Sequence, residues 1–182
     1  MTAAVLRPYA PRDADTVLSL NQSHLDSVGP LDAQRLQWLV GLTDACLVAV
    51  VDEATPSAMV TGQPPTNDTA TSETVVGYVM VLPPGTAYDS PNYRWFSERY
   101  DSFSYLDRVV VAEAYQRRGM GRLLYDAVEA RARERGRMTL EVYADPPNIT
   151  SLAFHEARGY LEVGRLTQTN GKTCAMFVKE LG

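Results

Sequence analysis

Gln116-Arg117-Arg118-Gly119-Met120-Gly121 stands between a β-branched run and an amphipathic helix, and this stretch decides the fold of the chain. Upstream, residues 105–111 (YLDRVVV) have the β-branched ending of a strand that emerges from a covered sheet. Downstream, apolar residues recur at helical spacing and predict a helix that packs on that sheet: Met120, Leu123, Leu124, Ala127 and Val128. Glu129 and Arg133 fall on its predicted wet side, and Gly136 ends it.

The start of this helix is a predicted binding site for an anion. The first backbone N–H groups of a helix lack partners and carry partial positive charge. Gly119 and Gly121 leave that backbone uncovered, and three arginines add charge: Arg117, Arg118 and Arg122. The pattern predicts a pyrophosphate cradle, although glycines also open helices for structural reasons alone. A dinucleotide fingerprint would need a small residue in place of Leu124, and the Gly-Lys-Ser/Thr of a P-loop is absent.

A second motif follows the apolar run 140–143 (LEVY). Two prolines cannot continue a strand, Asn148 or Ser151 can cap a short helix, and Gly159 can end it. The two motifs together resemble the GNAT N-acetyltransferase superfamily, whose pattern is Q/R-x-x-G-x-G/A, then Asn with defined residues three, six, seven, eleven and twelve positions later. Here those positions hold Asn148, Ser151, Phe154, His155, Gly159 and Tyr160. Only His155 departs from the pattern, because the family usually has Tyr there.

The resemblance covers residues 105–160 closely, and the stretch 88–96 (YDSPNYRWF) is similar to a subgroup of bacterial members whose substrates are not settled. It implies an α/β (α+β) fold, with a central, mostly antiparallel mixed sheet of about seven strands flanked by about four helices. This sheet is expected to splay at an acetyl-CoA site. We expect one domain over residues 1–182.

Local patterns predict matching elements. They are a strand at 3–7, helices at 13–22 and 32–42, an antiparallel pair at 47–51 and 75–82, and a closing hairpin of 160–166 with 173–179. Residues 52–74 are rich in Thr, Pro, Ser, Gly and Asp and predict a flexible insertion between two strands, or a segment that folds over a partner or substrate.

Composition limits the partners. With 182 residues, 45% of them hydrophobic, the chain can bury a full core, and its net charge of −5 argues against nucleic acid and anionic membranes. Two separate cysteines and two isolated histidines indicate neither a disulfide framework nor a metal site. No run approaches the ~18 apolar residues of a membrane span. We expect a cytoplasmic protein, monomeric or homodimeric.

The resemblance implies acetyl-CoA as co-substrate and names the positions that would bind it. They are Val109, Val110, Val111, Gln116, Arg117, Arg118, Gly119, Met120, Gly121, Arg122, Asn148, Ser151 and Phe154. Helix–sheet packing alone would also explain Phe154.

Acetyl transfer to an amine needs a base and gains from an acid. An amine of pKa about 10 must lose a proton before it attacks, and a departing thiolate of pKa about 8.5 gains from receiving one. His155 is the candidate acid, since an imidazole is partly protonated at neutral pH. Asp107 is the preferred base, because strand alternation puts it on one face with Tyr105 and Val109; Glu141 is the runner-up. The structural alternatives are a hydrogen-bonded filler for His155 and an arginine-paired brace for Asp107.

The acceptor pocket is expected in the variable N-terminal half, where aromatic side chains and carboxylates suit a cationic amine. The predicted substrate-binding residues are His24, Tyr93, Trp95 and Glu98. The sequence thus predicts an N-acetyltransferase that acts on a primary amine of a small molecule or peptide by direct attack in a ternary complex. The alternative is a non-catalytic acyl-CoA-binding or regulatory module with a degenerate site.

Overall fold

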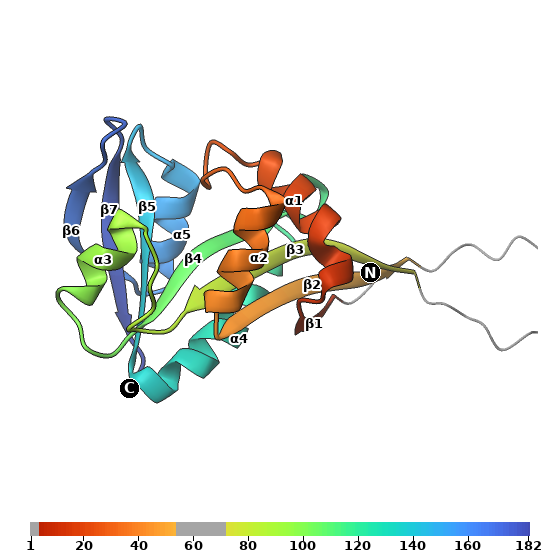
Figure 1. The fold of residues 1–182 in the computed structure, drawn as a ribbon, viewed down its shortest axis with the longest axis horizontal. Coiled ribbons are helices and arrows are strands. Elements are labelled where there is room, and N and C mark those ends of the chain that lie inside the picture. Colours follow the sequence, from red (N-terminus) through yellow and green to blue (C-terminus); the bar gives the residue numbers. More distant parts are fainter. Residues whose placement is uncertain (1–3, 54–71) are drawn as a thin grey trace, which may run out of the picture.

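The computed structural model describes residues 4–53 and 72–182. In this part of the chain, seven strands form one sheet in the order β1-β2-β3-β4-β5-β7-β6, and five α-helices flank it (Figure 1). All neighbouring strands are antiparallel except β4 and β5. The predicted mixed sheet is therefore confirmed.

The strands are β1 (Val5–Pro8), β2 (Ala45–Glu53), β3 (Ser72–Leu82), β4 (Ser104–Val111), β5 (Arg137–Asp145), β6 (Leu161–Thr167) and β7 (Thr173–Glu180). The helices are α1 (Ala14–Gln22), α2 (Ala33–Leu42), α3 (Pro91–Ser97), α4 (Met120–Ala132) and α5 (Ile149–Ala157).

Polar side chains fix where the helices begin. Asp32 accepts a hydrogen bond from the Arg35 N–H (2.7 Å) at the start of α2, and Asn148 accepts one from the Ser151 N–H (3.1 Å) at the start of α5. Helix α3, which the sequence patterns do not predict, begins with Ser90 as its cap and a proline in its first turn.

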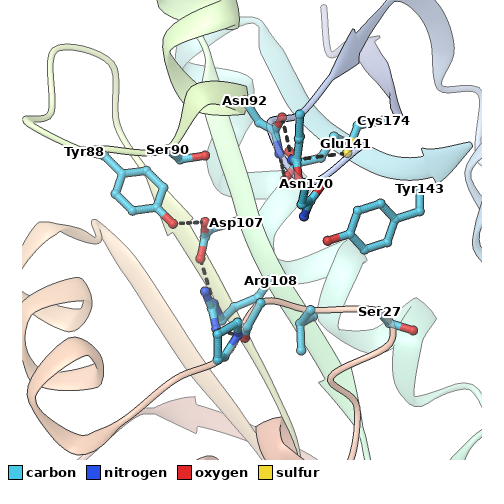
Figure 2. A pocket seen from close by; sticks show the side chains of 14 residues that line it. Ser27, Tyr88, Ser90, Asn92, Asp107, Arg108, Glu141, Tyr143, Asn170 and Cys174 are labelled. Atoms are coloured by element: carbon cyan, nitrogen blue, oxygen red, sulfur yellow. Dashed lines mark hydrogen bonds and ion pairs between the residues drawn. The ribbon is translucent and has the colours of Figure 1, made fainter. Parts of the chain in front are cut away.

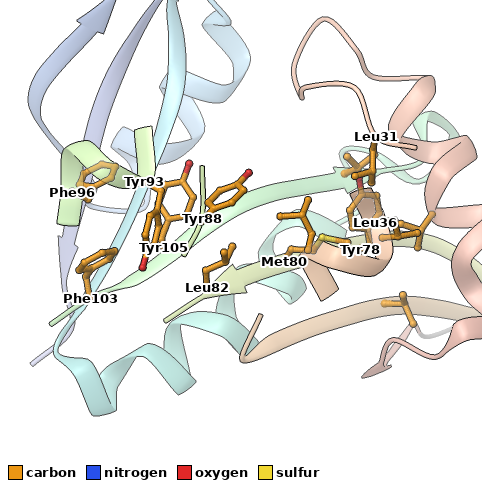
Figure 3. Close-up of a cluster of buried hydrophobic side chains, with 14 of the residues drawn as sticks. Leu31, Leu36, Tyr78, Met80, Leu82, Tyr88, Tyr93, Phe96, Phe103 and Tyr105 are labelled. Atoms are coloured by element: carbon orange, nitrogen blue, oxygen red, sulfur yellow. The ribbon is translucent and has the colours of Figure 1, made fainter. Parts of the chain in front are cut away.

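The sheet has a core on each face because its central strands alternate their side chains. From β3, Tyr78, Met80 and Leu82 join the core beside α1, α2 and α3 (Figure 3), whereas Val79 and Val81 join the core beside α4 and α5. Figure 1 shows α1 and α2 over the β2–β3 side of the sheet, and α3 beside β5 and β7.

Glu129 corrects the predicted wet side of α4. Its side chain is buried, where it accepts hydrogen bonds from Arg158 Nε (3.1 Å), the Tyr160 hydroxyl (2.9 Å) and Lys179 Nζ (2.7 Å). Helical periodicity alone missed this, because α5 and β7 supply a second set of partners for α4.

The ends of the predicted insertion belong to strands, since Asp52 pairs with Glu73 and Glu53 with Ser72. The prediction of a flexible connection concerns the remainder, 54–71, which lies outside the described residues.

The strands β4 and β5 open a gap in the sheet. They pair only at Ser104 with Met138 and at Tyr105 with Thr139. Beyond that point they diverge, which Figure 1 shows as a wedge between β4 and the β5–β7 pair. The predicted splay of the sheet is therefore present at this point.

A β-bulge lies at the point where β4 leaves β5. Met80 pairs with Arg108 but Val81 pairs with Leu106, so Asp107 is the extra residue. As a result Val109 packs on the α4 face, opposite to Tyr105. The prediction that alternation puts Tyr105, Asp107 and Val109 on one face is wrong, because the bulge shifts the register by one residue.

Candidate active site

Two cavities meet in the gap between β4 and β5. The α4 cavity has a volume of about 500 Å³ and follows β4 and the starts of α4 and α5. The β5 cavity has a volume of about 300 Å³ and lies between β4, β5 and the turn that joins β6 to β7. Ser27 and Val28, in the loop between α1 and α2, line both cavities.

The α4 cavity collects most of the residues predicted to bind acetyl-CoA. Its lining includes Val109, Val110, Val111, Gln116, Arg117, Gly119, Gly121, Arg122, Asn148, Ser151 and Phe154. Two predicted residues lie outside this lining. Met120 packs into the core beneath α4, and the Arg118 guanidinium lies 5.8 Å from the centre of the Tyr115 ring.

The start of α4 presents bare backbone to its cavity. Gly119 has φ +86°, a left-handed conformation that glycine adopts without strain. Leu123 N–H donates to Gly119 O (3.0 Å), so the helix offers no carbonyl to the N–H groups that precede Leu123. A Cβ on Gly121 would stand 3.8 Å from the Phe154 ring. Glycine therefore leaves room against the backbone at the point where a phosphate is expected.

A free strand edge forms another wall of the α4 cavity. Ala112 N–H donates to Val76 O (2.8 Å), so the antiparallel alternation turns the backbone groups of Val109 and Val111 away from β3 and toward the gap. The Val111 carbonyl accepts a hydrogen bond from Gln116 Nε2 (3.0 Å). The N–H groups of Val109 and Val111 thus face the gap, where β5 no longer pairs with β4.

His155 is buried and held as a neutral imidazole. Ser151 O can only accept, so His155 Nδ1–H donates to it (2.7 Å) and Nε2 accepts from the Tyr125 hydroxyl (2.6 Å). Burial lowers the pKa of His155 to about 4. At neutral pH this ring has no proton to give from Nε2, so its geometry matches the structural alternative rather than that of an acid.

Asp107 lies in the β5 cavity within a network of buried partners. Its Oδ1 accepts from the Tyr88 hydroxyl (2.5 Å) and its Oδ2 from Arg108 Nε (2.8 Å) (Figure 2). Arg108 also donates to Asn21 Oδ1 (2.9 Å) and to Gly29 O (3.3 Å). These bonds tie the bulge of β4 to α1 and to the α1–α2 loop, which is the arrangement of a structural brace.

Glu141 stands across the gap from Asp107 and faces the same cavity (Figure 2). Its Oε1 accepts from Asn92 Nδ2 (2.8 Å), and its Oε2 accepts from the Tyr105 hydroxyl (2.8 Å). Burial, and then the negative charge of Asp107, raise the pKa of Glu141 to about 8, against the opposing effect of both hydrogen bonds. This carboxyl group can therefore take up a proton near neutral pH.

The four predicted substrate-binding residues lie away from the β5 cavity. His24 lines the α4 cavity, where Gln116 Nε2 lies 3.2 Å from its Nε2. Tyr93 is in the core, with its hydroxyl donating to Pro83 O (2.8 Å). Trp95 packs so closely on β6 that a Cβ on Gly164 would lie 2.7 Å from its ring. Glu98 is exposed beside Arg99. Helix α3 turns these last three side chains toward the core, β6 and solvent.

Residues that the sequence did not single out complete both sites. Ser90, Asn92, Gln168, Asn170 and Cys174 line the β5 cavity. No local signal marked them, because polar residues of turns and helix starts are common. Tyr125 lies in α4, but it is not one of the apolar residues whose spacing predicted that helix.

In residues 4–53 and 72–182, no cluster of three or more His, Cys, Asp or Glu side chains is arranged to hold a metal ion. No helix in these two ranges has the length and hydropathy needed to cross a membrane.

Comparisons with known proteins show the fold and the family. A search of curated protein sequences finds no significant match. Among solved structures, NAA60 of Arabidopsis thaliana in complex with acetyl-CoA superposes with a TM-score of 0.71 at 20% identity, over 98% of this chain and 99% of that one. Ard1 from Thermoplasma volcanium gives 0.71 at 16% identity, over 99% of each chain. The ribosomal-protein-S18-alanine N-acetyltransferase from Escherichia coli gives 0.62 at 14% identity, over 99% and 95%.

These structures share the fold of this chain. The sequence profile of the acetyltransferase (GNAT) family matches residues 19–160, and the chain therefore belongs to that family.

Proposed function

We propose that this protein is an acetyl-CoA-dependent N-acetyltransferase that acts on a primary amine of a small molecule or peptide by direct attack in a ternary complex. The observation that carries the proposal is the position of Glu141, whose carboxyl group faces the β5 cavity, a cavity that shares the lining residues Ser27 and Val28 with the α4 cavity. Membership of the acetyltransferase family supports the reaction type. The relatives with an acetyl-CoA complex and with a named alanine acceptor support the co-substrate and the amine.

The α4 cavity would hold the co-substrate, which supplies an acetyl group on a thioester. Bare N–H groups at the start of α4, with Arg117 and Arg122 beside them, suit a pyrophosphate. The valines of β4 and the ring of Phe154 suit an apolar arm. The N–H groups of Val109 and Val111 would stabilise the negative charge that develops on the carbonyl oxygen during attack.

Glu141 is the proposed general base. Its pKa of about 8 lies near the working pH, where a base combines an available lone pair with sufficient proton affinity. Asp107 is the weaker candidate, because the buried guanidinium of Arg108 pairs with it (2.8 Å), whereas the hydrogen-bond donors to Glu141 are neutral. We assign Asp107 to the brace, from which its charge also raises the proton affinity of Glu141.

The proton donor to the departing thiolate is proposed to be Tyr143. Burial raises the pKa of this phenol above its usual value, so it stays protonated at neutral pH, and it lines the β5 cavity. Tyr160 is further from this role because its hydroxyl donates to Glu129. His155 would instead hold Tyr125 in the wall of the α4 cavity.

A thiol-release assay tests the function. Purified protein with acetyl-CoA and a broad panel of primary amines is expected to release free CoA thiol with at least one amine. Glu141→Gln is expected to lower turnover ~100-fold or more while acetyl-CoA still binds. The buried neutral His155, in place of the family's Tyr, favours the second candidate, a non-catalytic acyl-CoA-binding module. Calorimetric binding of acetyl-CoA with no thiol release for any amine would support that module and reject the enzyme.

A further inference from the structure

A chain of two side-chain amides leads from the β6–β7 turn to Glu141. Gln168 Nε2 donates to Asn92 Oδ1 (3.3 Å), and Asn92 Nδ2 donates to Glu141 Oε1 (2.8 Å). Gln168 Nε2 also lies 3.5 Å from Cys174 Sγ. The three side chains come from three separate segments: the β6–β7 turn, α3 and β5. Figure 2 shows Asn92 beside Glu141.

The direction of these bonds fixes the orientation of the Asn92 amide. An amide presents an oxygen that accepts and a nitrogen that donates, and rotation by half a turn exchanges them. Gln168 supplies a donor to one side of Asn92, whereas Glu141 supplies a carboxylate to the other. With Gln168 Nε2 turned toward Asn92, one orientation of the Asn92 amide satisfies both neighbours, and it aims N–H at the carboxylate.

The position of Asn92 is itself well fixed. Its side chain is buried, it belongs to the first turn of α3, and the Ser90 side chain caps that turn. A buried donor to an ionised carboxylate is one of the stronger hydrogen bonds in proteins. Asn92 therefore has both the geometry and the surroundings to influence how Glu141 exchanges its proton.

We propose that Asn92 is a positioning residue that holds the Glu141 carboxylate and favours its ionised form, and that Gln168 sets the orientation of Asn92. The proposal rests on the proposed role of Glu141 as the base. The β6–β7 turn would then help to position the base through Gln168 and Asn92, although that turn lies far from Glu141 in sequence.

Several other groups face Glu141, and the effect of Asn92 must be measured against them. They are Asp107, Arg108 and Tyr105 from β4, Tyr88 from the loop before α3, Tyr143 from β5 and Cys174 from β7. Lys172, from the β6–β7 turn, lies over the Tyr143 ring, with its Nζ 4.6 Å from the ring centre. Asp107 raises the proton affinity of Glu141, whereas Tyr105 and Asn92 lower it by donating hydrogen bonds. Removal of the Asn92 donor should move the titration of Glu141 to higher pH.

The test is a carbon-13 NMR titration of side-chain carboxyl groups, with Glu141→Gln used to assign the Glu141 resonance. Asn92→Leu removes the donor at similar volume and is expected to raise the Glu141 midpoint by about one pH unit or more. Asn92→Asp adds a like charge and should raise it further, while Gln168→Leu should cause a smaller shift in the same direction. Ser97→Ala, on the same helix but with its hydroxyl bonded within α3, is the matched control and should leave the midpoint unchanged.

The NMR titration needs no turnover, so it separates this inference from the proposed function. A Glu141 midpoint in folded Asn92→Leu that equals the wild-type value would overturn the inference. Should Asn92→Leu fail to fold, Gln168→Leu carries the test alone, and an unchanged midpoint there would reject the relay. An unchanged pH profile of turnover in Glu141→Gln would instead reject the base, whatever the NMR midpoints are.

Discussion

The two cavities are built in different ways. The α4 cavity is made mainly of backbone: a helix start with Gly119 and Gly121, and the free edge of β4 at Val109 and Val111. The β5 cavity is made of side chains from seven segments, among them Tyr88, Asn92, Asp107 and Glu141. A backbone site needs a continuous motif, whereas a side-chain site needs the fold to bring distant residues together. A local sequence motif can therefore reveal the first kind of site but not the second.

The largest expected effect is a loss of stability when the brace formed by Asp107 and Arg108 in the β5 cavity is broken. Asp107→Ala would leave Arg108 buried without its carboxylate partner, which typically costs about 3 kcal/mol or more in the free energy of unfolding. Urea denaturation should show this loss. The control is Arg165→Ala, which breaks the exposed pair with Glu162 and should leave the urea midpoint unchanged. Equal midpoints for Asp107→Ala and wild type would mean that Asp107 is no brace.

The backbone site should fail in a different way. Gly121→Val would place methyl groups where the phosphate is expected, and acetyl-CoA affinity should fall about tenfold or more through lost hydrogen bonds. The protein should stay folded, because the nearest atom to an added Cβ is a Phe154 ring carbon at 3.8 Å, an ordinary contact. Calorimetric titration measures the affinity, and circular dichroism checks the fold. Undiminished affinity in the folded variant would place the phosphate elsewhere.

The smallest expected effect concerns His155, which lines the α4 cavity. Its lowered pKa means that the folded protein binds a proton less readily than the unfolded chain. Its contribution to stability is therefore complete above pH 6.5 and is lost as the pH falls toward about 4. His155→Phe should remove this part of the pH dependence of unfolding, and Tyr125→Phe should weaken it less. An unchanged dependence in His155→Phe would contradict the neutral, buried imidazole.

The sequence was informative where local chemistry decides structure. The spacing of residues 116–121 predicted the helix start that lines the α4 cavity, and the predicted cap at Asn148 is confirmed, because each depends on neighbours a few positions away. The bulge at Asp107 could not be predicted from the sequence, since it depends on the pairing of β4 with the partner strand β3. The burial of Glu129 depends in the same way on residues of α5 and β7.

The residues of the β5 cavity were harder still to predict from the sequence. Glu141 was named as runner-up from its place on a strand, but its partners Tyr105 and Asn92 lie 36 and 49 residues away in sequence. Trp95 and Glu98 looked suitable for an amine, yet α3, which no pattern predicted, turns them away from the cavity. Sites that are built from distant side chains can be identified only when the fold is known.

The most direct measurement of the central claim is the pH dependence of kcat/KM for thiol release with an active amine, in wild type and in Glu141→Gln. If Glu141 is the base, the wild-type profile rises through about pH 8, as the carboxyl group loses its proton, and Glu141→Gln lacks this rise. A Glu141→Gln profile that superimposes on the wild-type profile would show that Glu141 is not the base.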